Sequence, residues 1–277
     1  MSIETREPLL RIEGLTVTAP GAPRDLVGGV DLVVHRGESV GIVGESGSGK
    51  SLTCRSVLGI VPDALGLRAD LLSFDGLDLA TLRERAWRDV RGRRIGAVFQ
   101  DPASYLNPSL TVGRQVAEAV RVAAGLPRRA ARREAVALLA SLGLRDAARV
   151  ATRFPHELSG GMLQRVLIAT AIAGSPDLLI ADEPTTALDA TVQAEVLDVL
   201  AALQRDRGLA LLFVSHDLAV VAQVCERIVV MRGGVVVETG RTADVLAAPA
   251  HPYTRSLLVA HRAYGLERRA PEEVAHV

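Results

Sequence analysis

Stretches of alternating and of uninterrupted apolar residues predict the strands of this protein. Residues 9–34 alternate apolar and polar positions around prolines and paired glycines, which is typical of short antiparallel strands. A similar stretch at 71–79 contains a central turn, and 227–237 reads as a hairpin about Gly233 and Gly234. By contrast, three segments are apolar almost throughout, as expected of parallel strands covered on both faces. They are residues 39–43, 178–181 and 210–214.

Apolar residues spaced three or four positions apart predict helices between these strands. One helix runs from Ser51 to Gly59 and is stopped before Pro62. Residues 112–142 contain two helices separated by a Gly-Leu-Pro break, and a further helix over 192–203 is closed by Gly208. The order of elements predicts an α/β fold, with a mostly parallel sheet, an antiparallel β edge and an inserted helical subdomain.

The composition of the 277 residues narrows the class of protein. Hydrophobic residues make up 48% of the chain, and the mean hydropathy of +0.24 indicates surfaces buried against partners. No run of 18 uncharged apolar residues is present, and the first eight residues lack the apolar core of a signal peptide. Cys54 and Cys225 lie far apart, which favours buried thiols in a reducing compartment over a disulfide framework or a zinc site. We therefore expect a cytoplasmic protein.

The charge pattern argues against nucleic acid as a partner. The formal net charge is zero, so no general attraction to a polyanion is indicated. Two arginine-rich segments, 83–94 and 128–133, could be read as nucleic-acid patches. Glu84 and Asp89 interrupt the first segment, and we interpret both as solvated faces.

Of the 32 lysines and arginines only Lys50 is a lysine, and it lies in the most informative motif of the chain. The motif is a phosphate-binding loop, G-x-x-x-x-G-K-[ST], which follows a predicted strand and opens a predicted helix. Its residues are Gly44, Glu45, Ser46, Gly47, Ser48, Gly49, Lys50 and Ser51. The glycines let backbone N–H groups converge on phosphate oxygens, Lys50 supplies an ammonium for the β- and γ-phosphates, and Ser51 supplies a magnesium ligand. A dinucleotide loop is excluded because Leu52 stands where that motif needs a third glycine.

Three further segments are placed to complete a nucleoside triphosphate site. Asp182 and Glu183 follow a buried strand, so they reach the same sheet edge as the phosphate loop, where Asp182 could hold magnesium and Glu183 could polarise a water. Ser159 is a good helix N-cap, and Gly160 and Gly161 leave that helix end open to an anion. His216 follows the next apolar strand. Taken singly, these residues also fit a solvated strand end, a plain helix cap and a structural histidine.

Together these residues resemble the nucleotide-binding subunit of ABC transporters, in the family's order and over nearly the whole chain. Gln100 falls at the Q-loop of that family, and residues 158–162 match its LSGGQ signature with Met162 in place of glutamine. Residues 187–189 match the D-loop, which ends in Asp189, and His216 matches the switch histidine.

The resemblance implies a P-loop (RecA-like) α/β core with an antiparallel β subdomain and an inserted α-helical subdomain. It implies a nucleotide-binding domain at 8–260, with the helical subdomain at about 103–173, and a short tail at 261–277. Two such domains would face head to tail and bind ATP and Mg²⁺ between the phosphate loop of one and the signature of the other.

The resemblance also assigns roles to the site residues. Glu183, His216 and Gln100 would be catalytic, and Ser51, Gln100 and Asp182 would hold Mg²⁺. The remaining contacts to ATP would come from the phosphate loop, from Asp189 and from the signature residues Ser159, Gly160 and Gly161.

Several segments resemble one branch of the family, the importers of dipeptides, oligopeptides and nickel. They are residues 99–102, 107–108, 181–189 and 251–254. Shorter segments, at 51–54, 58–62, 161–165 and 255–258, are similar to the first ATPase of nickel importers. The resemblance implies ATP-driven uptake of nickel, a metal chelate or peptides at the cytoplasmic face of the inner membrane. The implied partners are a second related ATPase subunit in a hetero- or homodimer, two membrane permeases and, indirectly, an extracytoplasmic substrate-binding protein. A cytoplasmic permease helix would dock near residues 100–108, where Tyr105 and Leu106 form an apolar bump that ordinary loop packing could also explain.

Two questions stay open at the level of sequence. ABC-type ATPases also act in DNA repair and translation, although the coiled coils, zinc modules or paired domains of those proteins are missing here. The family usually stacks adenine on an aromatic residue upstream of the phosphate loop, but no aromatic residue precedes Phe74, and Ala19 stands in the expected place. We therefore expect weak discrimination between ATP and GTP, unless another residue such as Arg24 supplies the stack.

Overall fold

A computed structural model describes residues 7–100, 102–186 and 188–267. Asp101 and Ala187, which belong to two of the family segments, and the last ten residues of the predicted tail lie outside this range. The strands are β1 Pro8–Thr18, β2 Val27–His35, β3 Ser39–Val43, β4 Gly66–Arg68, β5 Leu71–Phe74, β6 Leu77–Asp78, β7 Ile95–Val98, β8 Leu178–Asp182, β9 Ala210–Ser215, β10 Arg227–Arg232 and β11 Val235–Arg241. The helices are α1 Lys50–Val57, α2 Glu84–Val90, α3 Pro102–Tyr105, α4 Val112–Ala124, α5 Arg128–Ser141, α6 Ala147–Val150, α7 Gly160–Ala171, α8 Ala190–Arg207, α9 Leu218–Val224, α10 Thr242–Ala247 and α11 Pro252–Glu267, with a 3₁₀ turn at Pro155–Glu157.

The strands form a six-stranded and a five-stranded sheet. The larger sheet has the order β11-β10-β3-β9-β8-β7, with every pair parallel except β10 and β11. The smaller sheet is antiparallel, with the order β2-β1-β5-β6 and with β4 paired to β1. The predicted α/β fold with an antiparallel β edge is therefore confirmed, as is the hairpin about Gly233 and Gly234.

The continuous apolar runs of the parallel strands follow from burial on both faces. Along β8, Leu178 and Ile180 join one core cluster, which the antiparallel sheet and α1 share. The alternate residues Leu179 and Ala181 join a second cluster, which reaches into α4, α5 and α7. Successive side chains of a strand point to opposite faces, so both sets of side chains are buried where a strand lies between two cores. Apolar residues therefore follow one another along such a strand.

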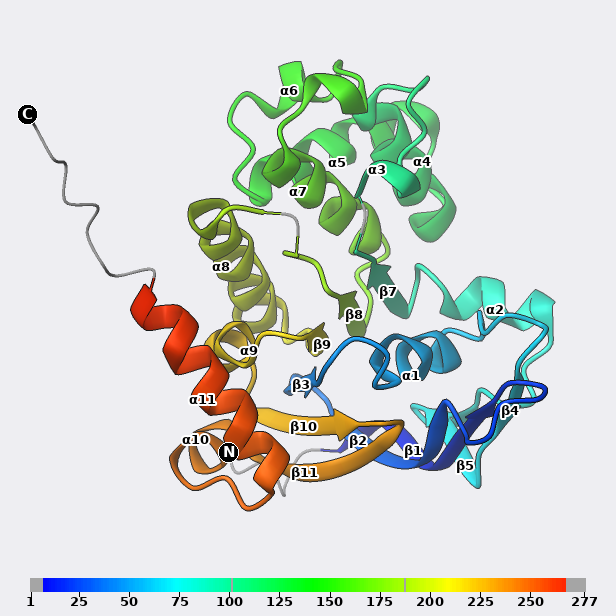
Figure 1. Cartoon of the computed structure of the whole chain (residues 1–277). Coiled ribbons are helices and arrows are strands. Elements are labelled where there is room, and N and C mark those ends of the chain that lie inside the picture. Colours follow the sequence, from blue (N-terminus) through cyan, green and yellow to red (C-terminus); the bar gives the residue numbers. More distant parts are fainter. Residues whose placement is uncertain (1–6, 101, 187, 268–277) are drawn as a thin grey trace, which may run out of the picture.

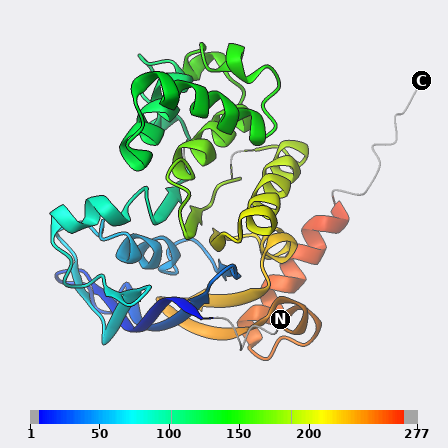
Figure 2. The same cartoon turned by 180° about the vertical axis from the view of Figure 1, so that it is seen from behind.

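The helices inserted after β7 form a separate lobe. Figures 1 and 2 show α3 to α7 standing together at one end of the molecule, on the far side of the parallel strands from the antiparallel sheet. Helices α4 and α5 are separated by Gly125, whose φ of 67° ends α4 in the left-handed conformation. The two predicted helices of 112–142 are thus confirmed, and the lobe runs from residue 102 to residue 171.

The two arginine-rich segments behave differently in the fold. Arg94 pairs with Asp75 at 2.6 Å and with Asp177 at 2.8 Å, and Arg91 donates to backbone carbonyls, so these side chains hold the fold together. The interpretation of 83–94 as a solvated face was wrong for Arg91 and Arg94. A guanidinium can lie along the surface and still donate to several protein acceptors at once. The second segment lies on α5, where its arginines are exposed as expected.

A buried carboxylate joins the two sheets just before β3, at the end of that strand away from the phosphate loop. Glu38 is fully buried and accepts hydrogen bonds from Arg227 Nε at 2.8 Å and from the backbone N–H of His35 at 2.8 Å. Burial alone would raise the pKa of Glu38, but the hydrogen bonds from Arg227 and His35 outweigh it and hold this pKa below its usual value of 4.5.

The Glu38→Ala variant is expected to lose about 3 kcal/mol of unfolding free energy, because it leaves Arg227 without its counter-charge. Since the folded-state pKa is depressed, this contribution is complete above the usual pKa of 4.5 and is lost as the pH falls through the folded value. Urea unfolding at several pH values measures the difference. Glu13→Ala, which removes an exposed ion pair with Arg11, is the matched control and should cost less than about 1 kcal/mol. Equal losses in the two variants would show that Glu38 is not a structural anchor.

Candidate nucleotide-binding site

The phosphate loop joins the end of β3 to the start of α1. Gly47 and Gly49 have φ values of 79° and 96°, a conformation that favours glycine. Gly44 is needed for a different reason, since a Cβ there would lie 2.1 Å from the carbonyl oxygen of Met231 on β10. The loop therefore presents bare backbone at the N-terminal end of α1, where backbone N–H groups and the helix dipole favour an anion.

Lys50 lies folded against its own loop. Its ammonium donates to the carbonyl oxygens of Gly44 at 2.7 Å and Glu45 at 2.8 Å, and the residue is only 4% exposed. Burial lowers the pKa of Lys50, while the charges of Glu183 and Asp182 act in the opposite direction. A phosphate beside this ammonium would add further negative charge and favour its protonated form.

Asp182 lies against the first turn of α1. β8 pairs with β9 up to Asp182 and Val214, so the carboxylate is at the carboxyl edge of the sheet, and the Ser51 hydroxyl donates to Asp182 Oδ1 at 3.0 Å. Burial raises the pKa of Asp182 above its usual value. Two hard oxygen donors side by side fit Mg²⁺, which usually takes only one or two protein ligands and fills its octahedron with phosphate oxygens and water. No cluster of three or more His, Cys, Asp or Glu ligands occurs among the residues that the structure describes.

Glu183 is the centre of a second group of side chains. Its Oε2 accepts from Gln100 Nε2 at 3.2 Å and from Thr186 Oγ1 at 2.9 Å, and lies 3.4 Å from His216 Nδ1. The backbone of Glu183 has a φ of 50° and its N–H donates to Val214 O at 2.9 Å. A residue other than glycine in this conformation is strained, and such strain is often found at functional sites.

One cavity of about 740 Å³ contains most of the predicted site. Besides the phosphate loop from Glu45 to Ser51, its lining includes Gln100, Glu183 and His216. Parallel strands bring these residues together, because β3, β7, β8 and β9 all end at this edge of the sheet. The sequence predicted this convergence for Glu183 and His216 from the strand ends, whereas Gln100 was placed only by the family resemblance.

Two residues of the site were not singled out by the sequence analysis. Thr186 donates to Glu183 and lies in segment 181–189, which resembles the importer branch. Its spacing of three residues from Glu183 was the sequence feature that could have indicated this contact. The Tyr253 hydroxyl accepts from the backbone N–H of Glu45 at 3.0 Å, and the Arg232 guanidinium lies 4.9 Å from the ring centre. No local pattern could have predicted the contact between Tyr253 and Glu45, because these residues are 208 positions apart.

The signature residues lie elsewhere. Ser159 caps α7 by accepting from the backbone N–H of Met162, and with Gly161 it lines a different cavity of about 500 Å³. A Cβ on Gly161 would lie 2.2 Å from Val192 Cγ1 on α8, so close packing already requires this glycine, whereas Gly160 is less crowded. Asp189 caps α8 by accepting from the N–H groups of Thr191 and Val192. Neither the signature nor Asp189 lines the cavity at the phosphate loop of the same chain.

Comparisons with known proteins agree with this geometry. Residues 27–186 match the ABC transporter family. The chain is 47% identical over 262 residues to a putative peptide import ATP-binding protein of Brucella abortus, covering 92% of this chain and 78% of that protein. It is 44% identical to the probable D,D-dipeptide transport ATP-binding protein of Escherichia coli, covering 95% of this chain and 81% of the relative.

Solved structures lead to the same family. A dimeric ATP-binding cassette in a post-hydrolysis state with ADP and Pi superposes with a TM-score of 0.74 at 28% identity, covering 84% of this chain and 99% of that one. The cbiO1 subunit of an ABC transporter complex from Clostridium perfringens gives a TM-score of 0.74 at 27% identity and covers 94% of this chain and 100% of that one. With its phosphate loop, its acidic strand end and these relatives, the chain belongs to the ATP-binding proteins of the ABC transporter family.

Proposed function

We propose that this chain hydrolyses ATP to drive an importer for peptides. The observation that carries the proposal is that the phosphate loop and Glu183 line one cavity, and that Ser51 in this cavity donates to Asp182. Relatives named for peptide and dipeptide import favour peptides as the cargo over the nickel or metal chelate suggested by short sequence segments. No helix among the described residues is long and apolar enough to cross a membrane. As the ATP-binding subunit of an importer, the chain is assigned a peripheral place on the cytoplasmic face beside its permeases.

Binding of the triphosphate falls to the loop and α1. The loop amides and Lys50 hold the β- and γ-phosphates. Ser51, Gln100 and Asp182 would hold Mg²⁺, which would offset phosphate charge when bound. The hydrogen bond between Ser51 and Asp182 keeps both oxygen atoms in place for this task.

Glu183 is the proposed base for the attacking water. It follows Asp182 at the strand end, so it lies one residue further from the loop, where a water can reach the γ-phosphate in line. Thr186 and Gln100 orient its carboxylate by donating to Oε2. His216 Nδ1 lies 3.4 Å from the same oxygen. The imidazole can turn to contact the γ-phosphate as negative charge develops on that phosphate.

Hydrolysis requires a second ATPase subunit. The Ser159 helix end is a good anion site that does not line the cavity of its own chain. We infer that Ser159, Gly160 and Gly161 contact the γ-phosphate bound by a partner subunit, with Asp189 at the same interface. The dimeric arrangement of a related cassette supports this inference. Loss of the bridging phosphate charge would then open the interface and move the transporter.

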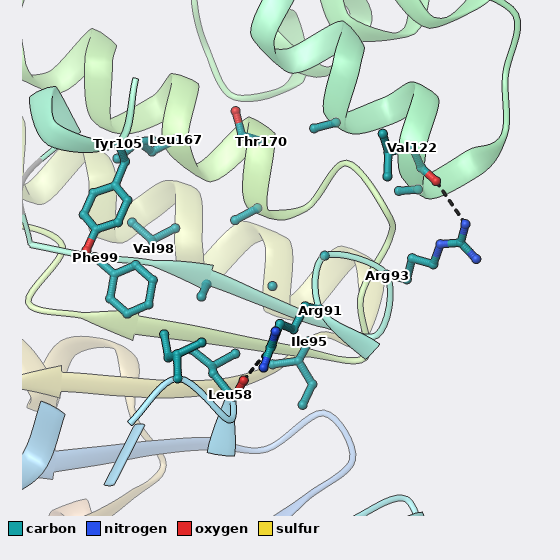
Figure 3. A pocket seen from close by; sticks show the side chains of 17 residues that line it. Leu58, Arg91, Arg93, Ile95, Val98, Phe99, Tyr105, Val122, Leu167 and Thr170 are labelled. Atoms are coloured by element: carbon teal, nitrogen blue, oxygen red, sulfur yellow. Dashed lines mark hydrogen bonds between the residues drawn. The ribbon is translucent and has the colours of Figure 1, made fainter. Parts of the chain in front are cut away.

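The permeases are proposed to dock in an apolar groove between the parallel sheet and the helical lobe. The groove has a volume of about 400 Å³ and runs along β7 beneath α4 and α7 (Figure 3). Tyr105 stacks on Phe99 at 5.1 Å and is half exposed, as is Val122 at the end of α4, whereas Leu106 is buried and does not form part of the exposed bump. An amphipathic helix is the partner that fits such a groove. The binding protein acts through the permeases, and we assign no nucleic-acid partner.

Recognition of the base is expected to be weak. Arg24 lies beside residues 45–48 of the phosphate loop in a hollow of about 300 Å³ that also contains Arg232. Without an aromatic platform, binding loses roughly 1 kcal/mol of stacking, so GTP should displace ATP with a Kd within about fivefold of that of ATP. Competition titrations of the purified chain measure this ratio. Strong discrimination against GTP would contradict the expectation, and its loss in Arg24→Ala would assign base recognition to Arg24.

Assembly with permeases tests the function as a whole. ATP hydrolysis by the chain should rise when it is reconstituted with its partner ATPase and peptide-importer permeases, because transport requires coupling between them. DNA or ribosomes added instead should leave the rate unchanged. Stimulation by DNA or ribosomes alone would support the alternative of a repair or translation ATPase.

A further inference from the structure

One arginine before β7 holds the far end of the phosphate-loop helix. Arg91 donates from Nε to Leu58 O at 2.8 Å (Figure 3). It also donates from Nη2 to Gly59 O at 2.7 Å. These carbonyls lie just beyond the last turn of α1, where an α-helix leaves its acceptors unpaired. The guanidinium lies 4.5 Å from the ring centre of Trp87, and Glu84 pairs with it at 3.1 Å. The side chain is therefore held from three sides.

A second arginine holds the helical lobe from the same loop. Arg93 donates to Val122 O, in the last turn of α4, at 3.1 Å (Figure 3). Gly92, between the two arginines, has a φ of 73°, and a Cβ on Gly174 would lie 2.1 Å from its carbonyl oxygen. The backbone of Gly92 therefore packs closely against Gly174, and the arginine side chains of the loop 91–93 connect α1 on one side with α4 on the other.

We propose that Arg91 is a positioning residue that links the apolar groove to the nucleotide. Helix α1 carries Lys50 and Ser51 at one end and is held by Arg91 at the other. It has eight residues and a length of about 12 Å, so a shift at one end moves the other as a rigid body. Arg91 also lines the groove, where a docked helix would contact the same guanidinium. This inference rests on the proposed function, which supplies the nucleotide and the groove's occupant.

The link must act in both directions. If a helix docked in the groove changes the affinity of the chain for nucleotide, then bound nucleotide must change the affinity of the groove for that helix by the same factor. The effect can therefore be detected in the purified full-length chain without a permease. A plain helix cap would behave differently, since it would stabilise α1 equally with and without nucleotide.

Hydrogen exchange with and without the magnesium complex of AMPPNP tests the inference. In the wild type, AMPPNP should slow amide exchange in the phosphate loop and α1, and also in residues 90–98 and the last turn of α4. In Arg91→Ala the phosphate loop should remain protected, while the nucleotide-dependent change at 90–98 falls about tenfold, as expected for the loss of a charge-assisted hydrogen bond. Arg91→Lys keeps the charge but cannot reach both carbonyls, so an intermediate value is expected.

Arg88→Ala is the matched control. It removes the same charge from an exposed position on α2 and should behave as the wild type. A nucleotide-dependent change at 90–98 that persists in Arg91→Ala would overturn the inference, and so would a loss of protection that is equal with and without AMPPNP. If AMPPNP does not protect the phosphate loop even in the wild type, the proposed function itself fails.

Discussion

Replacing Glu183 by glutamine should reduce ATP hydrolysis by the assembled transporter by about 10²- to 10⁴-fold, the range supplied by a general base. Glutamine keeps the size of the side chain and can still contact Thr186 and Gln100 by rotating its amide. It cannot take a proton from water. Binding of ATP should not weaken, because the hydrogen bonds of Lys50 and of the Ser51–Asp182 pair do not involve this side chain. Single-turnover hydrolysis and nucleotide titration, performed on the same preparation, measure the two quantities.

Glu134→Gln is the control for this change. Glu134 is exposed on α5, in the helical lobe and outside the cavity at the phosphate loop, so the same chemical substitution there should leave the rate unchanged. An assembled Glu183→Gln transporter with normal turnover would show that another group activates the water.

The second large effect is expected at the signature. Ser159→Arg puts a long side chain at the N-terminal end of α7, which we propose lies against the partner's γ-phosphate. Hydrolysis should fall by about 10²- to 10³-fold, comparable to the loss of a preorganised anion donor. The variant's own phosphate loop should still bind ATP, because Ser159 does not line that cavity. Rates measured over a dilution series of the transporter's ATPase subunits, with ATP binding measured alongside, test both parts.

Ser141→Arg adds the same bulk and charge at the exposed end of α5 and should be neutral. If dilution to single subunits left the specific activity unchanged, or if Ser159→Arg hydrolysed ATP at the normal rate, the proposed interface between subunits would be wrong.

Local sequence patterns were sufficient for most of the elements that carry the site. The phosphate loop is contiguous, so its glycines, Lys50 and Ser51 could be recognised from local spacing alone. The strand ends could be placed as well, because parallel strands that are buried on both faces have a composition of their own. The short helix α2 was not predicted, since seven residues with two apolar anchors carry little periodicity.

The sequence by itself determined that the chain binds a triphosphate and has an α/β fold, because both depend on short-range spacing. Only the tertiary structure decided that Gln100 donates to Glu183, that Tyr253 supports the loop at Glu45, and that Arg91 connects α1 with the groove. These contacts join residues brought together by sheet order and by the packing of two cores. Long-range contacts of this kind depend on how many elements pack at once, and no local pattern records that.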